Sequence, residues 1–164
     1  MLYNGCERDS FITNSSARIS FSMDTLYFDT VFTEVGTITR HFTIRNPHKD
    51  FIRISQLELA RGENSVFRMN VDGVNGLLFN DIEIPPNDSI FVFVEATLDP
   101  NGKDAMMIQQ DSIMAITNGN YQDIDMVAWG QDVHFISCDP QDSLTWIRSN
   151  ETWINDKPYL VKDY

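Results

Sequence analysis

Five short segments place an aspartate directly before a hydroxyl residue that is followed by an aliphatic one, and each hydroxyl is a candidate acceptor for a covalently attached group. The hydroxyl residues of these triplets are Thr25, Thr30, Ser89, Ser112 and Ser143. Composition alone predicts about one such triplet in a chain of this size. An aspartate before serine or threonine is also typical of a turn that leads into a strand. The pattern supports modification and turn formation about equally.

A second candidate is an oxygen-ligand cation site formed by Asp99, Asn101 and Asp104, which share one turn. The glycine and the distal bidentate glutamate of an EF-hand loop are missing, so we interpret this segment as a solvated turn. The cysteines and histidines have no zinc-type spacing. The sequence also has no Gly-x-Ser-x-Gly, His-Glu-x-x-His or phosphate-binding loop. We therefore expect no metal, no cofactor and no catalytic residues, and interpret the chain as a non-enzyme.

The chain has two cysteines, Cys6 and Cys138, one near each end. Cys6 follows Gly5 and precedes a polar stretch, and Leu2 stands four residues before it. This arrangement resembles the end of a bacterial lipobox, in which the cysteine thiol carries diacylglycerol. The segment before Cys6 is too short for a signal peptide, so lipid attachment requires a region upstream of Met1. A free cysteine and a disulfide to Cys138 are the alternatives, since spacing alone cannot establish a disulfide.

The composition describes an acidic globular chain with the length of one domain. Its 164 residues carry a formal charge of −12 and a pI near 4.4, and 42% of them are hydrophobic. That apolar content opposes wholesale disorder. Nucleic-acid backbones and anionic lipid headgroups are bound by clustered lysine and arginine, so both are disfavoured as partners. No apolar run approaches the roughly 20 residues of a membrane helix, and membrane contact is expected only through a lipid at Cys6.

Short strands are predicted to position these residues. Between residues 37 and 46, apolar residues alternate with threonine, histidine and arginine, as in a half-buried strand. A shorter strand begins at Leu26. The predicted core residues of this first strand pair are Phe28, Val31, Ile38, Phe42 and Ile44. In the segment 51–60 the apolar residues change parity midway, which indicates a β-bulge. Residues 109–117 and 121–129 form a predicted hairpin, because Asn-Gly is a preferred hairpin turn.

The most regular predicted strand spans residues 89–98, and both of its faces carry apolar side chains. Phe91 and Phe93 lie on the face where a one-sided sheet has polar residues. Such a face is covered either by the same chain or by a neighbouring module. We expect the tail aromatics to pack against it. These aromatics are Trp146, Trp153 and Tyr159.

The fold prediction is an all-β, Ig-like antiparallel β-sandwich of seven to eight strands, with irregular N- and C-terminal tails. Turn signals recur every 8–12 residues and no helical periodicity occurs. Residues 1–16 are interpreted as an N-terminal tether. The sandwich occupies residues 17–137, with residues 133–136 extending its last strand. Residues 138–164 are a linker or the start of a missing C-terminal module.

The order of these segments resembles a known family. The stretches LYFDTVFTEVGTITRHFTIRNP, IRISQLELARGENSVFRM, IEIPPNDSIFVFVEATLDP, DSIMAITNG and IDMVAWGQ follow one another. They resemble ASH domains, the Ig-like repeats of Hydin and related ciliary and centrosomal proteins, which are related to the major sperm protein fold. Asp29 stands where those domains have glycine, and Trp129-Gly130-Gln131 replaces a small Gly-x-Gly ending. With these two departures, the chain resembles uncharacterised surface lipoproteins of the Bacteroides lineage. The resemblance covers residues 19–131 and continues through residues 153–159.

The resemblance implies a non-catalytic structural or interaction module of a periplasmic or outer-membrane lipoprotein, anchored at Cys6. Such a module spaces or presents a partner domain, or contacts a protein or a glycan. The Asp-Ser/Thr-aliphatic triplets resemble the O-glycosylation sequon of exported proteins in Bacteroides-type bacteria. Two alternatives stay open: a carbohydrate-binding module with exposed aromatics, and an accessory domain of an enzyme whose catalytic part is missing. Likeness of fold alone is only an associational argument for function.

Overall fold

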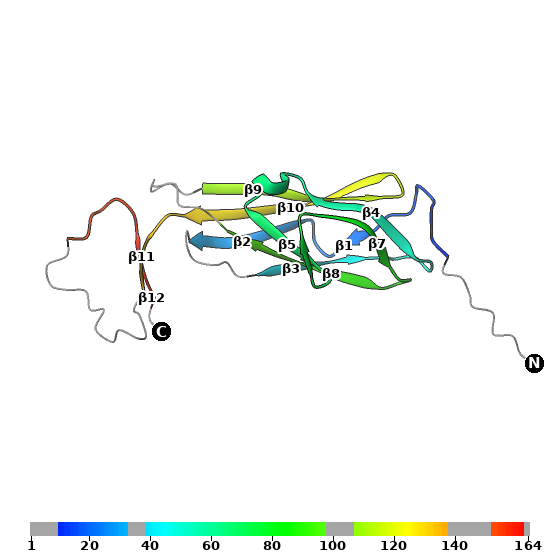
Figure 1. Ribbon diagram of the computed structural model, residues 1–164, viewed down its shortest axis with the longest axis horizontal. Helices are drawn as coiled ribbons and strands as arrows, with labels where there is room; N and C mark the ends of the chain where they lie inside the picture. Colours follow the sequence, from blue (N-terminus) through cyan, green and yellow to red (C-terminus); the bar gives the residue numbers. More distant parts are fainter. Residues whose placement is uncertain (1–9, 33–38, 98–106, 138–151, 163–164) are drawn as a thin grey trace, which may run out of the picture.

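The computed structural model describes residues 10–32, 39–97, 107–137 and 152–162. Within these ranges the chain forms two five-stranded sheets stacked in two layers (Figure 1). The β3 sheet contains, in spatial order, β1 (Ser20–Phe21), β3 (Arg40–Arg45), β8 (Ser89–Ala96), β5 (Phe67–Val71) and β6 (Val74–Gly76). The β10 sheet contains β2 (Thr25–Phe32), β10 (Asn120–Gln131), β9 (Met107–Thr117), β4 (Ile52–Leu59) and β7 (Leu78–Ile84).

The predicted Ig-like sandwich is confirmed. The order β3-β8-β5 in one sheet and β10-β9-β4-β7 in the other corresponds to the two packed sheets of Ig-like folds. Two details differ from the prediction. The described residues contain more strands than expected, and the pairing is not purely antiparallel, because β2 runs parallel to β10 along the edge of its sheet. No helix in the described ranges is long and apolar enough to cross a membrane.

The core lies between the inner faces of the two sheets and follows the predicted alternation. Among the predicted core residues, Phe28, Val31, Phe42 and Ile44 are buried, while Ile38 lies outside the described residues. In β8 every second residue, from Ile90 to Ala96, is buried. Because successive side chains of a strand point to opposite faces, this period places the apolar set of each strand between the sheets.

Two local predictions from the turn and parity patterns are confirmed. In β4 the pairing register with β9 shifts between Ile54 and Gln56, and this bulge lets residues of both parities face the core. The hairpin of β9 and β10 has Thr117 opposite Asn120, so Asn118-Gly119 forms a two-residue turn. Both turn residues have positive φ, 49° and 76°, as a type I′ hairpin turn requires.

Asn46 joins the ends of several strands just after β3. Its side chain is fully buried, and its Nδ2 lies 2.8–3.0 Å from the carbonyl oxygens of Asp50, Ile84 and Pro85. Its Oδ1 accepts a hydrogen bond from the backbone N–H of His48 at 3.0 Å. A buried amide side chain is fully hydrogen-bonded only when both its NH2 group and its oxygen have partners, and here both do. The asparagine therefore fastens the β3–β4 turn to the end of β7.

The described part of the N-terminal tether contacts the sandwich. Phe11 forms an isolated parallel bridge with Phe51, and the Phe51 N–H donates to the Ser10 carbonyl at 2.9 Å. The guanidinium of Arg53 lies 4.7 Å from the centre of the Phe11 ring. Residues 10–12 are thereby held alongside the start of β4.

The end of the predicted sandwich differs from expectation. Residues 133–136 do not extend β10. Instead, β11 (His134–Ser137) pairs in parallel with β12 (Tyr159–Lys162), and this small sheet lies beyond one end of the sandwich (Figure 1). The predicted boundary between the sandwich and the C-terminal segment, at 137/138, thus falls between two strands that pair with each other. The reason is long-range pairing, which no local pattern in residues 133–136 specifies.

Candidate functional site

The structure brings two of the five candidate hydroxyl residues together on the outer face of the β10 sheet. Asp125 of β10 lies opposite Thr25 of β2 on one side and opposite Ser112 of β9 on the other. Both hydroxyl residues are half-buried and Asp125 is exposed. Thr25, Asp125 and Ser112 therefore form one row across three neighbouring strands, although they are far apart in the sequence.

The other candidate hydroxyl residues are not part of this row. Thr30 of β2 and Ser89 of β8 are both exposed. Ser143 lies outside the described residues, as do both cysteines and the predicted turn with Asp99, Asn101 and Asp104.

The turn interpretation has direct support at one of the triplets. The Asp88 side chain accepts a hydrogen bond from the Ser89 N–H at 2.8 Å, and Ser89 is the first residue of β8. The Asp111 side chain accepts from the Ser112 N–H at the same distance, but both residues lie inside β9, so no turn precedes a strand there. An aspartate that bonds the next backbone N–H organises the local chain whether or not the hydroxyl is modified. Glycosylation of these residues stays a prediction.

A second row lies beside the first on the same face. Val127 of β10 is opposite Tyr27 of β2 and opposite Gln110 of β9. The two rows line a surface pocket of about 590 Å³, whose rim includes Ala60 and Arg61. We call this region the β2–β10–β9 pocket. Sequence reasoning missed it, because the neighbourhood of β2 and β10 depends on a parallel pairing between distant segments.

The Tyr27 ring stacks on the ring of Trp129. The two rings are nearly parallel, with an interplanar angle of 14° and centroids 6.0 Å apart. Tyr27 is 59% exposed, whereas Trp129 is half-buried. The strand periodicity of β2 and β10 is the sequence signal that could have identified this ring pair, because it places Tyr27 and Trp129 on the outward face of their strands. Offset stacking of this kind fixes ring orientation.

The outer face of the β3 sheet carries a different group of rings. Phe91 and Phe93 of β8 are 47% and 40% exposed. Their centroids lie 6.1 Å apart, and the His41 ring lies 5.9 and 5.6 Å from them. We call these three residues the Phe91 patch. Its rings come from adjacent strands, because His41 is the cross-strand partner of Phe93.

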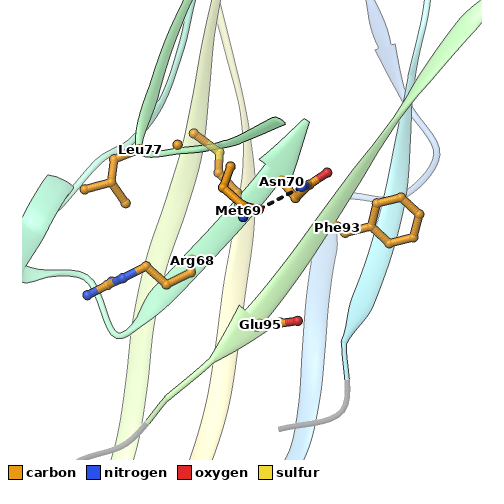
Figure 2. A pocket seen from close by; sticks show the side chains of 8 residues that line it. Arg68, Met69, Asn70, Leu77, Phe93 and Glu95 are labelled. Carbon is orange, nitrogen blue, oxygen red and sulfur yellow. Dashed lines mark hydrogen bonds between the residues drawn. The ribbon is translucent and has the colours of Figure 1, made fainter. Parts of the chain in front are cut away.

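A pocket of about 460 Å³ adjoins this patch at the other side of β8. Figure 2 shows Arg68, Met69 and Asn70 on β5 together with Phe93 and Glu95 on β8. The Asn70 side chain donates to Asn75 Oδ1 at 2.7 Å, which ties β5 to the short edge strand β6. Phe93 thus belongs both to the Phe91 patch and to the wall of a concave, mixed polar and apolar surface.

The expectation that the tail aromatics cover Phe91 and Phe93 is wrong for Trp153 and Tyr159. Trp153 stacks on Tyr159 with centroids 4.4 Å apart, and Tyr159 stacks on His134 at 4.6 Å. Strand β12 brings Tyr159 beside His134 through its pairing with β11, so these rings pack on one another instead. Trp146 lies outside the described residues.

One titratable pair accompanies this stack. His134 Nε2 lies 2.6 Å from Asp156 Oδ1. The hydrogen bond from His134 lowers the pKa of the Asp156 carboxyl below its ordinary value, because it favours the charged form. Next to it, Lys157 Nζ lies 3.6 Å from the fully buried carboxylate of Asp132. These contacts join β12 to the segment that leaves the sandwich.

Within the described ranges, no group of three or more histidine, cysteine, aspartate or glutamate side chains is placed to hold a metal ion. What the geometry does present is two exposed surfaces on opposite sheets. The Phe91 patch is aromatic and has a single polar ring, while the β2–β10–β9 pocket combines one exposed aromatic ring with hydroxyl, amide and carboxylate groups.

No protein-family model matches this chain, and no curated protein matches it. Among solved structures, a protein of unknown function from Porphyromonas gingivalis W83 is similar, with a TM-score of 0.50 and 17% identity. The similarity covers 69% of this chain and 46% of that protein, so this chain spans less than half of its length. It supports the fold alone.

Two further structures are less similar. A family 123 glycoside hydrolase from Clostridium perfringens has a TM-score of 0.47 and 9% identity, covering 73% of this chain and 27% of the enzyme. The CooA pilin subunit from enterotoxigenic Escherichia coli has a TM-score of 0.45 and 5% identity, covering 70% of this chain and 97% of the pilin.

Proposed function

We propose that this chain is a non-catalytic Ig-like interaction module that binds a protein partner through the Phe91 patch. The observation that carries the proposal is the exposure of two phenylalanine rings on the outer face of a central strand. Burying both rings against an apolar partner surface would remove them from water, which is the main favourable term in association. The described tail residues with aromatic rings pack elsewhere.

The chemistry of the patch favours a protein over a small polar ligand. Phenylalanine has no hydrogen-bonding group, and His41 is the one polar ring among the three. Protein interfaces are enriched in aromatic residues at their centre and carry polar groups at the rim. Thr39 and Glu95, which share a hydrogen bond of 2.9 Å, supply a polar rim near the patch.

We also propose the setting that the resemblance implies, a lipid-anchored ASH-type module at the bacterial surface or in the periplasm. The support is the sequence around Cys6 and the ASH-like order of segments from residue 19 to 131. Intact-mass measurement of protein expressed in a Gram-negative host with its natural upstream region tests this setting. A mass increase matching a diacylglycerol at Cys6, absent in Cys6→Ala, is expected; an unmodified Cys6 would overturn it.

Photo-crosslinking in the source organism tests the partner proposal. A photoreactive phenylalanine analogue at position 91 should crosslink to a defined protein, and the same analogue at Tyr121, on the opposite sheet, should not. Phe91→Thr and Phe93→Thr should each weaken binding of the purified partner about tenfold or more. Equal crosslinking from both positions, or unchanged affinity in both variants, would contradict the proposal.

A further inference from the structure

We infer that the β2–β10–β9 pocket binds a neutral oligosaccharide, with Tyr27 as the surface on which a sugar ring stacks. This site lies on the β10 sheet, opposite to the sheet that carries the Phe91 patch. Sugar binding at this pocket is therefore independent of the protein partner proposed for the Phe91 patch.

The strand register gives the pocket a defined footprint. Thr25, Asp125 and Ser112 form one row, and Tyr27, Val127 and Gln110 form the next. Neighbouring strands lie about 4.8 Å apart and residues two apart along a strand about 6.7 Å. The six side chains therefore occupy an area of about 10 by 7 Å on a rigid sheet, which suits a short oligosaccharide.

The aromatic wall of the pocket is preorganised. Tyr27 is 59% exposed, and its ring is held by stacking on Trp129. The C–H face of a pyranose ring is apolar, so it packs favourably on a flat aromatic face, while the tyrosine hydroxyl keeps its polar edge in water. Because the ring is already oriented, little side-chain freedom is lost when a sugar binds.

The floor and rim supply the hydrogen-bonding groups that sugar hydroxyls need. Thr25 and Ser112 can donate and accept, Gln110 does both through its amide, and the Asp125 carboxylate accepts. Arg61 is held at the rim by two hydrogen bonds. Its backbone N–H donates to Asp111 Oδ1 at 3.2 Å, and its side-chain Nη1 donates to the Gln110 carbonyl at 3.4 Å. Hydrogen-bond donors and acceptors placed around one aromatic ring, here Tyr27, are typical of a small-ligand site.

Charge selects neutral sugars over acidic ones. The pocket includes two aspartates, Asp111 and Asp125, and one arginine, Arg61. The whole chain carries a formal charge of −12. Sialylated, sulfated and uronic-acid glycans would be repelled by this field.

The test uses the full chain expressed without glycosylation, titrated with the neutral hexasaccharides of glucose, mannose and xylose by calorimetry and tryptophan fluorescence. At least one should bind saturably and change the tryptophan emission, and Trp129, which stacks on Tyr27, is the expected source of that change. Tyr27→Ala and Asp125→Asn should each weaken that binding about tenfold or more, and Tyr27→Phe should retain most of it. Far-UV circular dichroism and the thermal midpoint verify that each variant is folded.

Matched controls lie on β10, on the same outer face of the sheet as Asp125. Tyr121 is 74% exposed and Asp123 is exposed, and neither lines the pocket, so Tyr121→Ala and Asp123→Asn should bind as the unaltered chain does. Absence of saturable binding to any of the sugars would overturn the inference. So would equal affinity in Tyr27→Ala, or a protein that occupies this face in place of the sugar.

Discussion

Asn46 Nδ2 lies 3.0 Å from the carbonyl oxygen of Ile84, so that a fully buried side chain after β3 bonds the last residue of β7. The same nitrogen also contacts the carbonyls of Asp50 and Pro85. One asparagine thereby closes the end of the sandwich where two turns meet. Asn46 follows β3 directly and ends the Phe-x-Ile-x-Asn segment that begins at Phe42, and these bonds give a physical reason for an asparagine there.

Replacing this asparagine should destabilise the fold. Asn46→Ala removes the donor to the buried Ile84 carbonyl and to the partly buried carbonyls of Asp50 and Pro85, and we expect the free energy of unfolding to fall by about 2–4 kcal/mol. Urea denaturation followed by tryptophan fluorescence measures the change. Asn80→Ala, at an exposed position of β7, should change it by about 0.5 kcal/mol or less. Equal effects of the two variants would contradict the assigned role.

The inner and outer phenylalanines should differ in their contribution to stability. Phe67→Ala opens a cavity in the core, where the side chain is fully buried beside Phe28, and should cost about 3–5 kcal/mol. Phe93→Ala, on the outer face, should cost about 1 kcal/mol or less. The midpoints of urea unfolding compare them. A Phe93→Ala cost as large as that of Phe67→Ala would mean that the Phe91 patch is covered within the chain.

The β9–β10 turn should depend on Gly119. Its φ of 76° lies in the left-handed region, and a Cβ there meets nothing within 4 Å, so Gly119→Ala should cost about 1–2 kcal/mol through backbone strain alone. Asn118→Gly should cost less, because glycine adopts the required positive φ freely. Thermal unfolding measures both variants. A larger loss for Asn118→Gly would show that the asparagine side chain, not backbone conformation, stabilises the turn.

The Asp156 carboxyl should titrate below the ordinary aspartate value of 3.8, because it accepts a hydrogen bond from His134. A carboxyl with a lowered folded pKa stabilises the folded form above its unfolded pKa, and that contribution disappears as pH falls through the folded pKa. The β11–β12 pairing should therefore loosen below pH 3.8. Carbon-detected NMR titration measures the midpoint, which His134→Ala should raise and His48→Ala should leave unchanged. An unchanged midpoint in His134→Ala would refute the coupling.

Much of the fold was predictable because strand patterns are local. The alternation in β3 and β8 placed Phe42, Ile44, Val92 and Val94 in the core. The parity change between Ile54 and Leu57 indicated the β4 bulge. The Asn118-Gly119 dipeptide indicated the hairpin. In each case a few adjacent residues determine the backbone conformation, so the information lies within one short segment.

Only the tertiary structure decided which segments far apart in the sequence became neighbours. The parallel pairing of β2 with β10 puts Tyr27 against Trp129 and aligns Thr25 with Asp125 and Ser112. The pairing of β11 with β12 draws Tyr159 to His134 and away from Phe93. The sequence by itself determined the longer strands of the sandwich, their inward faces and the β9–β10 turn, because those follow from local periodicity and local turn residues. The sites depend on pairing between distant strands, whose partners are chosen by the packing of the whole core.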